Sequence, residues 1–334
     1  MKLMEVSSHS GISLKNVLFA TDFSEVSEAA LPYAAAICRR YNCQLHAVHV
    51  ISQASYIVPS EPVGSITIES MHEAARADAR ERMQALASHL KAVPHYSYIR
   101  EGDVWEVLCD MVRTREIDLL VLGTHGRTGL EKLVLGSKAE EILRQAPCPV
   151  LTVGSKVSGR AQLPTLAGED KDLTPLEISL RHIVYATDFT FESLAAAPFA
   201  ASLAQEFQAR LSLLHVIEGY ASVHRPPGPI EFALQRLAKL VPEEASLWCS
   251  PEPVVQFGSP AECILQRAFE SEADLIVLGV RPARHLAAAT HLPWTTAHKV
   301  IAHAQCPVLT IPFTTVLQRE KEQEGFFEFG EVIP

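Results

Sequence analysis

The sequence predicts an α/β protein built from two tandem, doubly wound domains, each with a parallel five-stranded sheet and helices on both faces. Three observations lead to this fold class. The chain has 334 residues, about twice the length of an ordinary domain. Short apolar runs of strand length alternate with longer helical patterns, an order typical of parallel sheets covered by helices. Finally, most of this pattern occurs twice along the chain.

The repeat is a tandem duplication with different internal loops. "NVLFATDFSE" at 16–25 matches "HIVYATDFTF" at 182–191, and "LHAVHVI" at 45–51 matches "LSLLHVI" at 211–217. Farther along, "EIDLLVLG" matches "EADLIVLG", and "APCPVLTV" matches "AQCPVLTI". We therefore expect a first domain at 14–153, a linker at 154–178, a second domain at 179–313 and a C-terminal tail at 314–334 that packs on the domain surface.

Within the first copy, each compact apolar run bounded by turn residues is expected to form a strand. A helix is expected over 71–91, where an apolar stripe runs along one face and charged residues fill the other. Pro32, repeated as Pro198, should kink or delay the first helix of each copy because proline lacks the N–H of a helical hydrogen bond, although its recurrence suggests that the geometry tolerates it. The expected strands are 16–21, 45–51, 95–100, 118–122 and 149–153, and the stripe consists of Met71, Ala75, Met83, Leu86 and Leu90.

Composition limits the class of protein. Hydrophobic residues make up 48% and charged residues 20%, as in soluble globular proteins. We find no secretory signal and no apolar run of the roughly 18 residues that a membrane helix needs, so we expect a cytoplasmic protein. The net charge of −10 disfavours nucleic acid and anionic membranes as partners. Seven scattered cysteines without a C-x-x-C pair favour neither a metal clip nor a disulfide framework.

The stretch "GTHGRTGLEKLVLGSKAEEIL" at 123–143 concentrates four of the chain's 16 glycines. Gly126 and Gly129 would keep the loop free of Cβ atoms, so that backbone N–H groups can turn toward an anion. Gly136 would allow close approach, and Ser137 would cap the next helix in a capping box with Glu140. This pattern predicts a phosphate cradle at a helix N-terminus, although a simple turn and cap would use the same residues.

Asp22 directly follows the first expected strand. Ligands of open α/β sheets bind beyond the carboxyl ends of the strands, at the point where the strand order reverses. If that point lies between the first and fourth strands, Asp22 would face the glycine stretch and could bind ribose hydroxyls or a metal ion held by phosphates. Its alternative role is to cap the following helix.

Together, these motifs resemble the universal stress protein family, in the branch that binds ATP. The most specific element is glycine, two residues, glycine, nine residues, glycine, then Ser or Thr, which Gly123, Gly126, Gly136 and Ser137 satisfy. The resemblance covers nearly all of 14–153, and its fold features extend over 179–313. It implies the strand order 3-2-1-4-5, which places the switch point between the first and fourth strands.

The resemblance also implies ligand contacts for ATP, with Mg²⁺ held through the nucleotide. Asp22 would lie near the ribose or the metal, and the backbone of Val50 would bind adenine. Arg127 and Lys138 could equally be solvated surface charges, and His125 is expected to be a surface residue rather than a base. The implied binding residues are Ala20, Thr21, Asp22 and Val50 for the nucleoside, Gly123 for the ribose, and Gly126, Arg127, Gly136, Ser137 and Lys138 for the phosphates.

The second copy keeps Asp188, Val216 and Gly279 but departs from the pattern after them. Pro282 stands in place of Gly126, and Trp294 and Thr295 stand in place of Gly136 and Ser137. We therefore expect one competent nucleotide site and one degenerate site. The nearby histidines are expected to be solvated or packed rather than to bind a metal, because no Cys or carboxylate joins them at ligand spacing. They are His285, His291, His298 and His303.

Three functions remain open. The first is an ATP-binding regulator of the stress response, and the second is a slow ATP hydrolase or nucleotidyl-transfer enzyme in which Asp22 holds the metal. The third is a nucleotide-independent scaffold or small-ligand carrier that uses the second domain. No catalytic residue is expected, since the chain lacks a Walker motif, a nucleophile elbow and a zinc-protease motif. The family also pairs its last strands in dimers, so "CPVLTV" and "CPVLTI" could form a pseudo-dimer within one chain, with room for further homo-oligomerisation.

Overall fold

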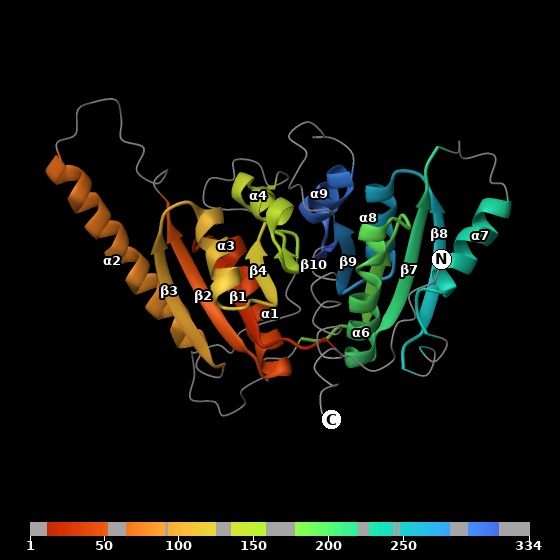
Figure 1. Ribbon diagram of the computed structural model, residues 1–334, viewed down its shortest axis with the longest axis horizontal. Helices are drawn as coiled ribbons and strands as arrows, with labels where there is room; N and C mark the ends of the chain where they lie inside the picture. The colour runs from red at the N-terminus through yellow and green to blue at the C-terminus, as the bar shows by residue number, and fades with distance from the viewer. Residues whose placement is uncertain are drawn as a thin grey trace, which may run out of the picture. The chain divides into compact units, whose positions relative to one another are not determined.

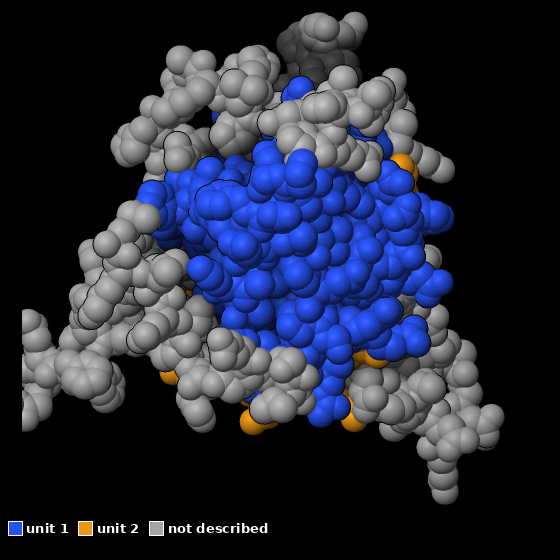
Figure 2. Space-filling view, turned by 90° about the vertical axis from the view of Figure 1, so that its right-hand side faces the viewer, with its two compact units in different colours: residues 1–12, 143–150, 180–334 blue, residues 13–142, 151–179 orange. Residues whose placement is uncertain are grey.

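The computed structural model divides the chain into two compact units (Figure 2). The N-terminal unit comprises 13–142 and 151–179, and the C-terminal unit comprises 1–12, 143–150 and 180–334. The residues that the structure describes are 12–52, 65–90, 93–124, 135–157, 178–219, 227–242, 245, 248–280 and 293–313.

The first half of the chain forms a parallel sheet with the order β3-β2-β1-β4-β5 (Figure 1). β1 pairs in parallel with β2 and β4, and β2 pairs in parallel with β3. This confirms the predicted α/β fold class and strand order. The elements are β1 Asn16–Thr21, α1 Glu25–Tyr41, β2 Gln44–Ile51, α2 Ser65–His89, β3 His95–Glu101, α3 Val104–Thr114, β4 Leu119–Gly123, α4 Ser137–Gln145 and β5 Val150–Val153.

The second half repeats this arrangement with the order β8-β7-β6-β9-β10. Its central strand β6 pairs in parallel with β7 and β9, and β9 pairs in parallel with β10. The elements are β6 His182–Ala186, α5 Phe191–Leu194, α6 Ala197–Phe207, β7 Arg210–Ile217, α7 Pro227–Ala238, β8 Pro251–Phe257, α8 Pro260–Glu270, β9 Leu275–Val280, α9 Pro293–His303 and β10 Val308–Pro312.

The central strands are covered on both faces. Val17, Leu18 and Phe19 of β1 are consecutive and each is 0% exposed. Because neighbouring side chains of a strand point to opposite faces, full burial of three in a row requires packing on both sides of the sheet. All five residues of β6 are likewise buried. The apolar strand runs in the sequence therefore correspond to the doubly covered core.

Helix α2 begins earlier than predicted, at Ser65, and its apolar stripe is only partly buried. Met83 and Leu86 pack in the core, whereas Met71 is 39% exposed. The apolar stripe therefore extends along the helix beyond the part that packs in the core. In Figure 1 the N-terminal end of α2 extends beyond the strands of the sheet.

The repeated proline has different effects in the two halves. Pro32 lies inside α1, which runs uninterrupted from Glu25 to Tyr41. In the second copy the helix is split into α5 and α6, and Pro198 lies in the first turn of α6, where no N–H donor is needed. The predicted interruption is thus found only in the second copy. Within the described part of the chain, no helix is both long and apolar enough to cross a membrane.

Candidate functional site

The carboxyl ends of β1 and β4 form the switch point of the N-terminal sheet. In the sheet, β2 and β3 lie on one side of β1, and β4 and β5 lie on the other side. Ala20 lies opposite Leu122 of β4, and Thr21 lies opposite His49 of β2. The structure therefore brings the predicted residues at the end of β1 beside Gly123, the last residue of β4.

The turn from β1 into α1 is held by its own side chains. The Thr21 and Ser27 hydroxyls are 3.0 Å apart, and the Phe23 N–H donates to Thr21 Oγ1 over 2.9 Å. Ser24 is the N-cap of α1, and Asp22 Oδ1 accepts a 3.0 Å bond from the Ser24 N–H. Asp22 thus supports the turn just before the cap. A carboxylate accepts several hydrogen bonds, so this role is compatible with a ligand contact.

Phe23 and His49 form a contact that sequence reasoning missed. Phe23 has a φ of 60°, which is unfavourable for a bulky residue, and its ring lies 4.4 Å from that of His49. His49 Nδ1 donates to the Thr21 carbonyl over 2.8 Å, which fixes the proton on Nδ1. The available signal was the spacing from Asp22 to His49, which recurs between Asp188 and His215.

The backbone of Val50 faces the side of β2 on which β1 lies. The Ile51 carbonyl accepts from the Gly102 N–H, so the peptide groups of Ile51 face β3. Alternate residues of a parallel strand turn their peptide groups to opposite neighbours, so those of Val50 face β1. β1 ends at Thr21, opposite His49, and Val50 lies one register position beyond that end.

Gly123 has a steric role that does not depend on a ligand. A Cβ at this position would lie 2.8 Å from both the Ser27 nitrogen and the Val26 carbonyl oxygen in the first turn of α1. Real Cβ atoms do not approach backbone atoms so closely, so only glycine lets α1 pack against the end of β4. Gly279 is more crowded still, because its Cβ would lie 2.0 Å from the Glu192 oxygen.

Gly136 occupies the N-cap of α4. Its carbonyl accepts from the Glu140 N–H over 2.9 Å, and its own N–H donates to the Thr124 carbonyl over 2.9 Å. The helix begins at Ser137, so the prediction of Ser137 as N-cap in a capping box with Glu140 is wrong by one residue. Ser137 and Lys138 instead contribute first-turn N–H groups, the donors that bind anions at helix N-termini. His125, Gly126 and Arg127 lie outside the described residues.

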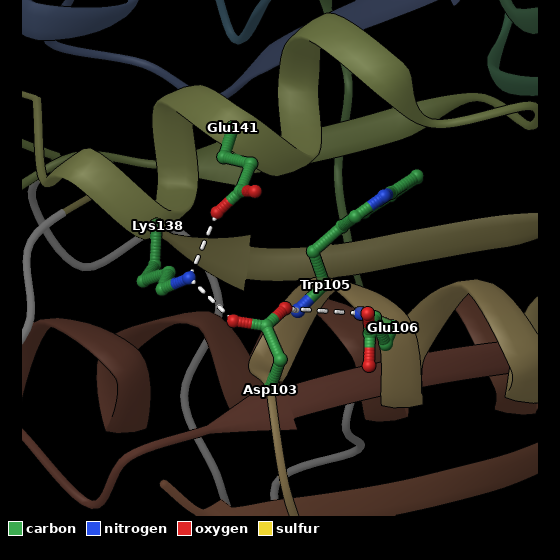
Figure 3. A network of polar contacts seen from close by, with 5 residues as sticks. All are labelled: Asp103, Trp105, Glu106, Lys138 and Glu141. Carbon is green, nitrogen blue, oxygen red and sulfur yellow. Dashed lines mark hydrogen bonds and ion pairs between the residues drawn. The ribbon is translucent and has the colours of Figure 1, made fainter. Parts of the chain in front are cut away.

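Lys138 is held between two carboxylates (Figure 3). Its Nζ lies 2.8 Å from Asp103 Oδ2 and 2.9 Å from Glu141 Oε2. Asp103 is also the N-cap of α3 and accepts from the N–H groups of Trp105 and Glu106. The Asp103 carboxylate raises the pKa of Lys138, and the bond from Lys138 lowers the pKa of Asp103. The charge of Lys138 is therefore retained at the start of α4.

The C-terminal unit reproduces the turn after its first strand. The Thr187 and Ser193 hydroxyls are 2.9 Å apart, and the Thr190 N–H donates to Asp188 Oδ1 over 2.9 Å. Phe189 again has a positive φ, and its ring lies 4.4 Å from that of His215. Burial raises the pKa of Asp188, but the hydrogen bonds it accepts outweigh burial and lower it overall. The residues that the second copy shares with the first therefore stabilise the turn after β6.

The rest of the second copy differs. Ser259 stands in place of Asp103 and makes no capping hydrogen bond through its side chain. Thr296 stands in place of Lys138, so the ion pair between the two helix starts has no counterpart. Position 294 lies in α9, whereas Pro282, His285 and His291 lie outside the described residues. Among the residues that are described, no three His, Cys, Asp or Glu side chains come together as a metal site.

Comparison with known proteins gives two family matches along the chain. The model of the universal stress protein family matches residues 13–154 and again 179–312. A universal stress protein of Methanocaldococcus jannaschii is 29% identical over 42% of this chain and 81% of its own length. The universal stress protein A homolog 1 of Coxiella burnetii is 32% identical over 42% of this chain and 97% of its own length.

A solved structure matches over both halves. The crystal structure of a universal stress protein from Archaeoglobus fulgidus has a TM-score of 0.64 and 17% identity, and the match covers 90% of this chain and 97% of that one. At this level of identity the match shows a shared fold. The duplicated architecture is therefore also found in a known structure.

Proposed function

This chain belongs to the universal stress protein family, and we propose that its N-terminal unit binds ATP and that the protein is a nucleotide-dependent regulator of the stress response. The observation that carries the proposal is Gly136 at the N-cap of α4, in the half of the chain that keeps the complete glycine spacing. A glycine N-cap leaves the first-turn amides open to a phosphate. The switch point between β1 and β4 supplies the neighbouring Asp22.

Each part of the site would meet a different part of the nucleotide. The Val50 peptide groups would hydrogen-bond the adenine edge, Asp22 would bind the ribose hydroxyls or Mg²⁺ held by the phosphates, and Ser137 and Lys138 would bind the phosphates. Lys138 would exchange part of its pairing with Asp103 and Glu141 for the more highly charged phosphates. The remaining assigned residues, Ala20, Thr21, Gly123, Gly126 and Arg127, would line the same site.

The C-terminal unit is proposed to lack this activity. Each cradle donor contributes about 1 to 3 kcal/mol, and micromolar binding needs about 8 kcal/mol in total. Pro282 in place of Gly126 would remove one amide donor, and the indole of Trp294 in place of Gly136 would fill the phosphate space. We also propose that the domains run over 14–153 and 179–313, that 154–178 links them, and that the protein is cytoplasmic.

Calorimetric titration of the nucleotide-stripped full chain with ATP and Mg²⁺ tests the proposal. We expect one ATP per chain, and about 100-fold weaker binding in Gly136→Trp, because the indole would fill the space of a phosphate; this loss corresponds to about 3 kcal/mol. Gly228→Trp is the matched control, because a Cβ at Gly228 meets nothing within 4 Å. This variant should bind as the wild type does.

Two other results would contradict the proposal. Two ATP molecules per chain would mean that the second copy is competent, and no binding would favour the scaffold or carrier function. Phosphate release measured on the same samples addresses the enzymatic alternative. Turnover that disappears in Gly136→Trp would replace the regulator by a slow ATP hydrolase.

A further inference from the structure

The C-terminus of α1 carries two cysteines in the segment "CRRYNC" at 38–43. Asn42 has a φ of 51° and a ψ of 44°, the left-handed conformation that ends many helices. The N–H groups of Asn42 and Cys43 both donate to the Cys38 carbonyl, the bond from Cys43 being 2.9 Å long. A bond from the second residue past the helix to the carbonyl five positions earlier defines a Schellman motif.

This motif brings the two cysteine side chains together. Its first and last residues commonly touch through their side chains, and here these residues are Cys38 and Cys43. Interaction between the two neighbouring thiols lowers the pKa of Cys43 and raises the pKa of Cys38. Both are free cysteines and both are buried, with exposed fractions of 0% for Cys38 and 3% for Cys43.

The backbone distance is short enough for a disulfide. Each Cα lies about 1.5 Å from its own nitrogen and about 2.4 Å from its own carbonyl oxygen. With 2.9 Å between Cys43 N and Cys38 O, the two Cα atoms cannot be more than about 7 Å apart. Disulfides span Cα distances of about 4.4 to 6.8 Å. The cysteines can therefore be bridged with little movement of the backbone.

The C-terminal unit shows that packing alone does not require cysteine here. The equivalent helix ends in the same motif, with Gln208 at a φ of 51° and a 2.9 Å bond from the Ala209 N–H to the Ala204 carbonyl. Both alanines are 0% exposed. One copy of the fold thus fills the two positions with inert methyl groups, and the other fills both with thiols.

We propose that Cys38 and Cys43 are an oxidant-responsive modification site, in which a peroxide converts the two thiols into a reversible intramolecular disulfide. The Cys43 thiolate attacks the peroxide oxygen, which breaks the O–O bond, gives a sulfenic acid and releases water or an alcohol. The Cys38 sulfur then attacks the Cys43 sulfur, the S–S bond forms and water leaves. Two thiols are oxidised by two electrons, and one peroxide is reduced.

Access to the buried thiols requires only local opening. Arg39, Arg40 and Asn42, which belong to the same turn, are all exposed. Opening of the last turn of a helix costs less free energy than global unfolding, so a small oxidant can reach the sulfurs in the folded protein. The site does not involve the nucleotide-binding residues, and the proposal is independent of ATP binding.

The trypsin cleavage sites within the motif provide a direct test. The full chain is treated with hydrogen peroxide, remaining thiols are alkylated, and the protein is digested without reductant. Trypsin cuts after Arg39 and Arg40, which separates peptide 16–39 from peptide 41–76. We expect these two peptides to run as one linked species that loses two hydrogens and separates on reduction.

Two variants control the experiment. Cys38→Ala/Cys43→Ala copies the second half and should fold, with a thermal midpoint within about 4 °C of the wild type, and it should form no such link. Adding Ala204→Cys/Ala209→Cys to this variant should create a disulfide at the end of α6. The proposal is overturned if peptides 16–39 and 41–76 separate without reductant, if either cysteine pairs elsewhere, or if the transferred pair stays reduced.

Discussion

The two halves of the chain share a fold and differ in a few local features. This comparison distinguishes the residues that the fold requires from those that a ligand site would require. Both halves keep the strand order, the hydrogen-bonded turn after the first strand and a glycine that packs against the next helix. Among the residues that the structure describes, the Gly136 cap, the Lys138 pair and the Cys38–Cys43 contact occur in the first half alone. Shared features are explained by folding, so evidence for function rests on the others.

Asp22 and Gly123 illustrate the consequence. Both belong to the family pattern, yet Asp188 and Gly279 occupy the same places in the half that lacks the complete glycine spacing. Asp22 and Asp188 each accept the N–H two residues later, and both glycines prevent a backbone clash. Their presence alone therefore does not indicate nucleotide binding. The α4 N-terminus is the more diagnostic region.

The largest expected effect concerns the shared glycines. Gly279→Ala should destabilise the protein by about 3 kcal/mol or more, because its Cβ would meet backbone that cannot move without shifting a helix. Gly123→Ala, with contacts near 2.8 Å, should cost about 2 kcal/mol. Urea unfolding followed by circular dichroism measures both.

Gly228→Ala is the control for these two variants, since its Cβ would meet nothing and the site lies in α7. Alanine there should be neutral or stabilising by up to about 1 kcal/mol. If Gly123→Ala and Gly279→Ala unfolded like this control, packing would not explain why both halves keep the glycine.

A smaller effect should separate the two halves at α3 and its counterpart α8. Asp103→Ala should cost about 1 kcal/mol, because Asp103 caps α3 through two backbone N–H groups. Ser259→Ala should cost only a few tenths of a kcal/mol, since the Ser259 side chain makes no capping bond. Equal losses in urea unfolding would contradict the difference between these two caps.

The smallest expected effect is a pH dependence of protein stability that arises from the Asp103 carboxylate. The bond from Lys138 holds the pKa of Asp103 below its ordinary value of 3.8. Its contribution to stability is therefore complete above pH 3.8 and is lost as the pH falls through the lower, folded-state pKa. Asp103 is partly exposed, so the change should stay below about 1 kcal/mol.

Urea unfolding of the wild type and of Asp103→Asn at pH 5 and pH 3 measures the contribution of the ionised Asp103 carboxylate to stability. Asparagine keeps an oxygen acceptor for the cap but does not titrate. The wild type should lose more stability than the variant on acidification. Parallel losses would show that the Lys138 pair does not stabilise the folded state.

The sequence by itself determined the fold class, the duplication and the strand order that the family resemblance implied. Predicted strand 16–21 matches β1 to the residue, because a run of apolar residues between turn residues is a local property. Because the pattern occurs twice, the elements of one copy could be compared with those of the other. The location of the switch point, and with it the neighbourhood of Asp22, followed from the order of strands.

Only the tertiary structure decided what individual residues touch. Gly123 meets α1, Lys138 meets Asp103, and Gly136 bonds to Thr124, all through elements that the fold brings together from a distance. Met71 fits the helical stripe but is 39% exposed. Periodicity fixes the side of a helix on which a residue lies, whereas burial and close contact depend on what the rest of the chain places against that side.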